Sequence, residues 1–471
     1  MKKFNKDSYL KKLKLKRNWQ RFSKYFCVGI PCVLCLVLGI YFAYSKFFVS
    51  KEQSVVRTTV GDFIYGDVVI NAYIDGEYSS TIPGKNDGYV VDKVSCDNGA
   101  VGEWNNNDWG LLTTNLTKRT KCNVYFKKLV SKVPDIIAQL DTTGKCPTMN
   151  ADGSVSVTGL EATNGYLCKA KDAYGDSYYY RGNVTNNYVK FADKYWRIVR
   201  INGDGTVRVI YDGTSAHVNG EASEDRQIGT SAFNSSYNDN VYVGYMYGQT
   251  GASTYAAAHA NTNDSTIKAY IDNWYKTNMF GTTNEQYLAD NVFCNDRSIS
   301  TYTTSSNTKL GYGTNSTYYR WVYSPWNGTN YGNMTMMLTC PQKNDAFTVS
   351  DSTNGNGALT YPVGLLSADE IVLAGGWPVA NSGYYLYSGQ YWWASSPFDF
   401  NGNYARVRSI GSSGYANYSD YVNSNNGVRP VLNLKAEAIK YGDGTASNPY
   451  RLTESLDNSS SNESGGIDTG D

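Results

Sequence analysis

The chain has 471 residues, of which 41% are hydrophobic and 18% are charged, and it holds 42 tyrosines and 45 glycines. This length predicts two or three domains, and the hydrophobic share is sufficient for each to form a core. Tyrosine suits pleated sheets while asparagine and glycine make turns, so the composition favours turn-rich β-structure. The formal charge of +1 hides a basic arm, because residues 1–24 hold ten Lys or Arg against one Asp. A nucleic-acid partner would fit this arm, but the segment that follows argues against it.

Residues 25–45 (YFCVGIPCVLCLVLGIYFAYS) carry no charged side chain. A transmembrane helix requires about 20 apolar residues, and the basic flank would hold the N-terminus in the cytoplasm. A cleaved signal peptide is the alternative. The long basic leader and the bulky Tyr41, Phe42 and Tyr44 argue against cleavage. We therefore expect a signal anchor and a single-pass cell-membrane protein, with its C-terminal domains outside the cell.

Six cysteines follow the apolar run. They are Cys96, Cys122, Cys146, Cys168, Cys294 and Cys340. Fifteen pairings are possible, and the sequence cannot choose among them. Nearest-neighbour pairing within the expected domains would join 96 to 122, 146 to 168 and 294 to 340. With only two histidines and no CxxC motif, a zinc site is not favoured. We expect disulfides formed outside the cell and no cofactor.

The remaining chain divides by composition. After a linker over residues 46–60, residues 61–128 predict a small β-sandwich-like domain. It resembles a β module of exported bacterial proteins, for which a stalk is a commoner role than ligand binding. Residues 129–145 predict a linker helix and residues 146–452 a large domain. Residues 453–471 contain no basic or aromatic side chain and are expected to be disordered.

Four segments of the large domain have a local signature. Two apolar-alternating strands joined by NGDG predict a hairpin over residues 188–213. Apolar residues at helical spacing predict an amphipathic helix over residues 265–280. A Ser–Glu capping box followed by two glycines predicts a second helix over residues 367–376. Between the helices, residues 295–335 are rich in Tyr, Thr, Ser and Asn, which is typical of exposed binding loops.

The closing segment, residues 391–435, is built mainly from Tyr, Asn, Ser, Asp, Gly and Arg. Alternation along NYARVRSI predicts that Ala405 and Val407 face inward, while Tyr404, Arg406, Arg408 and Ile410 face outward. At least one of the paired tryptophans at 392 and 393 is expected in the core. Tyr with Ser and Asn is also the alphabet of antibody loops. The expected ligand-binding residues are Tyr391, Trp393, Tyr404, Arg406, Arg408, Tyr415, Asn417, Tyr418, Asp420, Tyr421, Asn423 and Asn425.

The order of hairpin, helix, long loops, capped helix, WW-S-P and GVRPVL resembles a C-type-lectin-like domain. More narrowly, it is similar to the bacterial branch that includes formylglycine-generating enzymes and the variable proteins of diversity-generating retroelements. The matching segments are Lys194–Asp212, Leu366–Gly376, Tyr391–Pro397 and Gly427–Leu434. The resemblance implies that the closing polar face binds the ligand. The whole chain is then predicted to be α+β: a transmembrane helix, a small β domain, and a C-type-lectin-like domain with two helices around short antiparallel sheets.

Catalysis is not indicated. The related oxidases use a cysteine pair late in their domain, whereas no cysteine follows Cys340 here. Asp369 and Glu370 could serve a glycosidase, but helix capping explains both. The EPN, QPD and WND motifs of calcium-dependent sugar-binding lectins are absent. We expect an adhesin-like surface protein whose ligand is another surface protein or a glycan. The alternatives are a structural envelope protein without a ligand and, less favoured, an enzyme on the formylglycine-generating scaffold.

Overall fold

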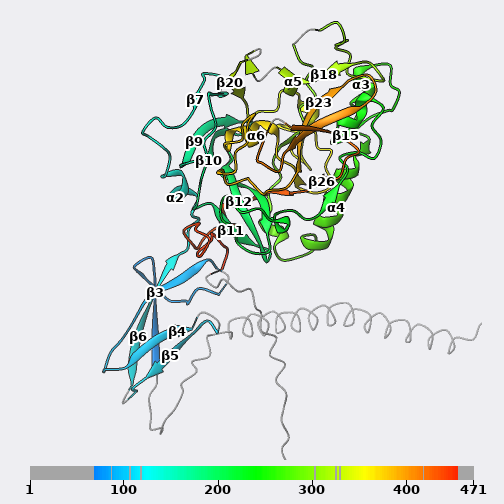
Figure 1. The fold of residues 1–471 in the computed structure, drawn as a ribbon. Coiled ribbons are helices and arrows are strands. Elements are labelled where there is room, and N and C mark those ends of the chain that lie inside the picture. Colours follow the sequence, from blue (N-terminus) through cyan, green and yellow to red (C-terminus); the bar gives the residue numbers. More distant parts are fainter. Residues whose placement is uncertain are drawn as a thin grey trace, which may run out of the picture. The chain divides into compact units, whose positions relative to one another are not determined.

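The computed structural model (Figure 1) describes residues 68–453, except 86, 106–107, 117–118, 302–303, 324–325, 328–329 and 417. Side chains are described for the same residues apart from 322–334 and 418. The chain divides into two compact units, Met1–Leu129 and Val130–Asp471, and each is described on its own. The predicted basic arm, apolar segment and first linker, and all but the first residue of the predicted tail, lie outside the described residues.

The predicted α+β class is wrong, because the protein is mostly β, with 35% strand against 13% helix. Most helices of unit 2 are only four to six residues long, so they cap and connect sheets and do not form a layer. The predicted membrane helix and single-pass cell-membrane location are also overturned. No helix in the described part of the chain is long and apolar enough to span a bilayer, and residues 25–45 lie outside that part.

Unit 1 contains a four-stranded sheet and a hairpin that share one core. Its strands are β1 (Val68–Ile74), β2 (Glu77–Ser79), β3 (Tyr89–Cys96), β4 (Val101–Asn105), β5 (Gly110–Thr114) and β6 (Thr120–Lys128). The sheet order is β2-β1-β6-β3, with β1 and β6 parallel, and β4 pairs with β5. Trp104 and Leu111 of this hairpin pack on Phe126 of β6, so both layers depend on one apolar interior.

The main sheet of unit 2 has seven strands in the order β22-β27-β13-β12-β10-β9, with β11 paired to β12. Their bounds are β9 (Gly165–Asp172), β10 (Gly175–Gly182), β11 (Tyr188–Phe191), β12 (Lys194–Ile201), β13 (Val207–Gly213), β22 (Val363–Gly364) and β27 (Val431–Leu434). The antiparallel pair β12–β13 confirms the predicted hairpin. Gly205 closes its turn at φ +82°, a conformation that favours glycine.

A second sheet of unit 2 carries the closing segment, in the order β14-β26-β23-β24-β25 with β18 paired to β23. Its strands are β14 (Thr230–Ser231), β18 (Thr317–Tyr318), β23 (Trp392–Phe400), β24 (Ala405–Ile410), β25 (Tyr418–Tyr421) and β26 (Asn426–Gly427). The shorter strands are β7 (Thr148–Met149), β8 (Val155–Val157), β15 (Met246–Tyr247), β16 (Asn263–Asp264), β17 (Phe293–Cys294), β19 (Trp326–Asn327), β20 (Asn330–Met336) and β21 (Ala346–Phe347).

The helices of unit 2 are α2 (Val133–Ile137), α3 (Tyr255–Ala258), α4 (Thr266–Asn278), α5 (Arg320–Tyr323) and α6 (Ala368–Leu373), with single 3-10 turns at η1 (Glu224–Arg226), η2 (Asn240–Val243), η3 (Glu285–Tyr287), η4 (Lys343–Asp345) and η5 (Ala436–Ala438). Side-chain caps start the helices α3, α4 and α6. Ser265 caps α4, and Ser367 with Glu370 forms the capping box of α6, which confirms both predictions. Of the linker helix predicted over residues 129–145, only the five residues of α2 are helical.

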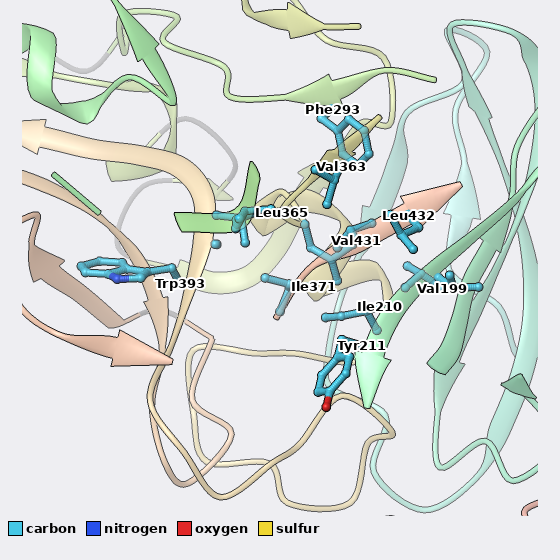
Figure 2. Packing of buried hydrophobic residues seen from close by; sticks show 14 of the residues in the cluster. Val199, Ile210, Tyr211, Phe293, Val363, Leu365, Ile371, Trp393, Val431 and Leu432 are labelled. Atoms are coloured by element: carbon cyan, nitrogen blue, oxygen red, sulfur yellow. The ribbon is translucent and has the colours of Figure 1, made fainter. Parts of the chain in front are cut away.

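The core of unit 2 lies between the two sheets and α6. Figure 2 shows Ile210 of β13, Val431 of β27 and Ile371 of α6 among its packed side chains. Trp393 of β23 belongs to the same cluster and is fully buried. Because all these elements contribute to one cluster, the two sheets and α6 stabilise one another.

Charged side chains are buried beside this core. Glu370 of α6 lies 3.2 Å from Arg200 Nε and 2.5 Å from Arg208 Nε. Burial opposes the charge on Glu370, yet the two guanidinium groups outweigh it and lower the pKa of that carboxyl. Glu370 therefore joins α6 to the main sheet, and Asp369, 2.8 Å from Arg320, joins α6 to α5.

Three disulfides cross-link the described chain: Cys96–Cys122, Cys146–Cys168 and Cys294–Cys340. The nearest-neighbour pairing is thereby confirmed. The first joins residues paired directly across β3 and β6 in unit 1. The other two lie within unit 2, and disulfides of this kind form and persist in oxidising compartments.

Candidate ligand-binding surface

The β23–β24 hairpin sets the geometry of the closing face. At its turn, Asn401 Oδ1 accepts hydrogen bonds from the backbone N–H groups of Asn403 at 3.0 Å and Tyr404 at 2.9 Å. Gly402 takes φ +96° in this turn. An Asx turn of this type fixes where the chain re-enters the sheet. It therefore fixes the position of Tyr404, which immediately precedes β24.

Three exposed tyrosines contact one another at this end of the sheet, and we call them the tyrosine patch: Tyr237, Tyr404 and Tyr421, which are 37%, 40% and 45% exposed. The rings of Tyr237 and Tyr404 stack with centroids 5.2 Å apart and planes at 21°. Tyr421 leans on Tyr404 at 4.9 Å and 54°. Within the described chain, no hydrogen bond occupies the three hydroxyl groups, so rings and hydroxyls are both available to a ligand.

Backbone hydrogen bonds hold the patch in place. The N–H of Ala405 donates to the carbonyl of Tyr237 at 2.7 Å, and the N–H of Val422 donates to the carbonyl of Ala405 at 3.1 Å. One residue of β24 thus fixes the segments that carry the two flanking tyrosines. The aromatic surface is preorganised, which lowers the entropy that a ligand must overcome.

Beside the patch, Arg406 is neutralised by Asp399. Its Nε and Nη2 lie 2.8 Å and 2.5 Å from the two carboxylate oxygens, and the two residues face each other across β23 and β24. Burial raises the pKa of Asp399, although Arg406 acts in the opposite direction. The Arg406 guanidinium also lies 4.8 Å from the ring centroid of Phe398. The Arg406 side chain is only 30% exposed, so a ligand would meet one edge of the guanidinium, and its charge is already paired with Asp399.

Two predicted contact residues are in the interior. Trp393 donates its indole N–H to the carbonyl of Ser231 at 2.8 Å and packs edge-on against Phe233. Arg408 is 1% exposed, lies over the rings of Phe398 and Trp321, and donates to the Trp321 carbonyl. The prediction that Arg408 and Ile410 of β24 face outward is wrong, because each is only 1% exposed. Aromatic side chains cover Arg408, and Ile410 packs in the core.

The other predicted residues lie at several places. Tyr391, Asn423 and Asn425 are exposed. Tyr415 is half-buried and bridges to Trp377 through the backbone. Asp420 accepts a hydrogen bond from Asn426 at 2.8 Å. Asn417 and the side chain of Tyr418 lie outside the described part of the chain. Of the twelve predicted residues, the structure therefore brings Tyr404, Tyr421 and Arg406 into one surface.

Tyr237 was missed because nothing in its local sequence marks it. It lies in NSSYNDN, a polar stretch that predicts only a turn. Its role depends on contact with Tyr404, which is distant in sequence. Long-range contacts of this kind leave no periodic signal.

The described residues hold neither a free cysteine nor a cluster of side chains arranged around a metal ion. All six described cysteines are in disulfides, so Cys294 and Cys340 do not form the free pair that a thiol-dependent oxidase requires. Across the same part of the chain, no group of three or more His, Cys, Asp or Glu side chains is arranged to hold a metal ion.

Fold and surface together define a disulfide-linked, mainly β protein with an exposed aromatic patch at a sheet edge. Comparisons of the chain with models of protein families, with curated proteins and with solved structures found no match. The resemblance of residues 146–452 to C-type-lectin-like domains therefore stays a prediction that rests on sequence motifs.

Proposed function

We propose that this protein is a recognition protein that binds its ligand, another surface protein or a glycan, through the tyrosine patch. The observation that carries the proposal is the contact of three exposed tyrosines, Tyr237, Tyr404 and Tyr421. Tyr offers a large amphipathic contact area with little rotamer entropy to lose. The resemblance of the closing segment to ligand-binding faces of C-type-lectin-like domains supports the same reading.

Charge around the patch favours a ligand without a strong net charge. Arg406 is paired with Asp399, and Asp420 is bonded to the amide of Asn426. An anionic ligand would have to displace Asp399 from Arg406 and leave a buried carboxylate unpaired, which is unfavourable. Stacking and hydroxyl hydrogen bonds remain as the main sources of affinity.

The disulfides indicate where such a protein would work. Three bonds within two units support maturation in an oxidising compartment. Both candidate ligands, exposed glycans and surface proteins, occur in that environment.

The test is a binding screen of the purified full-length chain on a glycan array and on a panel of immobilised cell-surface proteins. The variant carries Tyr237→Ala, Tyr404→Ala and Tyr421→Ala together. We expect its affinity to fall at least about tenfold, since aromatic anchors dominate interfaces. Tyr78→Ala, which removes an exposed tyrosine from unit 1, is the matched control.

Two results would contradict the proposal. The first is equal binding by the wild type and the triple variant, which would place the ligand elsewhere. The second is the absence of any binding by a folded wild-type chain, which would favour a structural envelope protein. An unchanged thermal melt of the triple variant shows that a lost signal reflects the patch and not the fold.

A further inference from the structure

A small pocket opens in unit 2 where the chain after α2 crosses the end of the β9–β10 hairpin. Its free volume is about 180 Å³. It is lined by Gln139, Asp141, Gly165, Tyr166, Leu167, Tyr180, Val184 and Asn186. None of these residues belongs to the tyrosine patch, so the pocket is a separate feature.

Backbone contacts fix the walls of this pocket. The N–H of Asp141 donates to the carbonyl of Leu167 at 2.9 Å, and Tyr180 faces Leu167 across the β9–β10 ladder. On the other side, Asn186 Nδ2 donates to Gln139 Oε1 at 2.7 Å. The pocket is therefore bounded by a sheet end and a tied pair of amides, which keep it open without a ligand.

The charge of the lining excludes an anionic ligand. No Lys, Arg or His side chain lines the pocket. The single carboxylate, Asp141, already accepts from the N–H groups of Lys145 at 2.7 Å and Cys146 at 3.1 Å, and from the hydroxyl of Thr143 at 2.6 Å. Its charge is thus stabilised by the protein itself and does not call for a bound cation.

Polar and apolar groups converge in the lining. The Tyr180 hydroxyl is buried and has no hydrogen-bond partner among the described residues, and a buried polar group in that state is unfavourable. Asn186 supplies an amide, and Tyr166 supplies a half-buried ring with its hydroxyl. Leu167 and Val184 add apolar surface. Apolar walls with a few placed polar groups are the pattern of small-molecule sites.

We propose that this pocket binds one neutral sugar unit, as a free monosaccharide or as the end of a glycan. A sugar ring presents C–H groups to tyrosine rings and hydroxyls to amides, and it needs no counter-ion. The volume also fits, because it is below the roughly 300–1,000 Å³ of pockets that take drug-sized ligands. The proposal is independent of the tyrosine patch and stands if that patch binds a protein.

Saturation-transfer NMR of the full-length chain with glucose, galactose, mannose and N-acetylglucosamine tests the proposal. We expect transfer to at least one of these sugars and an affinity that falls about fivefold in Asn186→Ala, the effect of one lost hydrogen bond. Tyr166→Ala should weaken binding as well. Tyr78→Ala, which removes an exposed tyrosine of unit 1 that belongs to neither the pocket nor the patch, should leave sugar binding unchanged, and equal melting temperatures would show that the variants fold.

Four outcomes would overturn this assignment. They are no transfer to any of the four sugars, equal transfer in the wild type and in Asn186→Ala, preferential binding of ethanolamine, which would make the pocket an amine site, and loss of sugar binding in Tyr404→Ala but not in Asn186→Ala, which would move the sugar to the patch. The first three outcomes do not bear on whether the patch recognises a ligand.

Discussion

The guanidinium of Arg320 donates two hydrogen bonds of 2.8 Å each to the carboxylate of Asp369. The same carboxylate accepts from the indole of Trp321 at 2.7 Å, and Arg320 also lies 3.2 Å from Asp296. Trp321 in turn packs against Arg408, whose other ring partner is Phe398. A continuous set of contacts therefore runs from α6 to the strands that carry the tyrosine patch.

Removing Arg320 should destabilise the protein strongly. Arg320→Ala leaves the buried Asp369 and Asp296 without their cation, which typically costs about 3–5 kcal/mol. Arg320→Lys keeps the charge but cannot make the two-pronged contact, so a substantial part of the loss should remain. Chemical denaturation measures both variants. Lys132→Ala, which breaks an exposed ion pair with Asp135, is the control and should change the free energy of unfolding by no more than about 1 kcal/mol. Equal stability of Arg320→Ala and the wild type would contradict the prediction.

Replacing Trp393 in the closing segment should lower the free energy of unfolding much more than replacing Tyr404. Trp393→Ala removes a fully buried ring and its hydrogen bond to Ser231, and we expect a loss of about 3–5 kcal/mol in the free energy of unfolding. Tyr404→Ala removes a ring that is 40% exposed, and we expect at most about 1 kcal/mol. Thermal melts of the two variants decide the point, and a reversed order would contradict the assignment of Trp393 to the core.

The Cys294–Cys340 disulfide should contribute to stability through the loop that it closes. The two cysteines are 46 residues apart, and chain-entropy reasoning gives about 4 kcal/mol for a loop of that length. The double variant Cys294→Ser, Cys340→Ser should therefore melt at a lower temperature than the wild type. Its remaining disulfides should stay formed, which mass spectrometry after thiol labelling verifies. A melting temperature equal to that of the wild type would show that the Cys294–Cys340 disulfide does not stabilise the folded protein.

Acid should destabilise the protein through His259. Burial, with the nearby Arg297, lowers the pKa of this imidazole to about 2, although its hydrogen bond to the Gly311 carbonyl acts in the other direction. In the unfolded chain its pKa is about 6.5. Below pH 6.5 His259 is protonated in the unfolded state but not in the folded state. The free energy of unfolding therefore falls as pH falls, by up to about 1.4 kcal/mol per pH unit from this residue.

Urea titrations of the wild type and His259→Gln between pH 7 and pH 5 test this dependence. The variant should show the shallower decline because glutamine does not titrate. Parallel curves for the two proteins would assign the acid sensitivity to other groups.

Local signals in the sequence predicted local structure well. The β12–β13 hairpin, helix α4 and the capping box at Ser367 each depend on residues close together in the chain. The disulfides followed because each joins the nearest available partner. Such features need no knowledge of the rest of the fold.

Features that depend on distant segments were not predictable. The burial of Arg408 requires Phe398 and Trp321 to cover it, and alternation along one strand cannot reveal which face a neighbour covers. Tyr237 enters the patch only because the N–H of Ala405 binds its carbonyl. Within the described chain, helix was overestimated at the predicted linker, residues 129–145, of which only Val133–Ile137 form a helix.

The place of β27 in the main sheet has a consequence for how the protein is made. This strand, Val431–Leu434, lies between β13 and β22 and pairs with both, although β13 is synthesised more than two hundred residues earlier. A nascent chain on the ribosome therefore holds an open β13 edge while more than two hundred further residues are added, and open edges invite pairing with other chains. The large unit can close only when its last strand emerges, so its folding is largely post-translational and slow for its size.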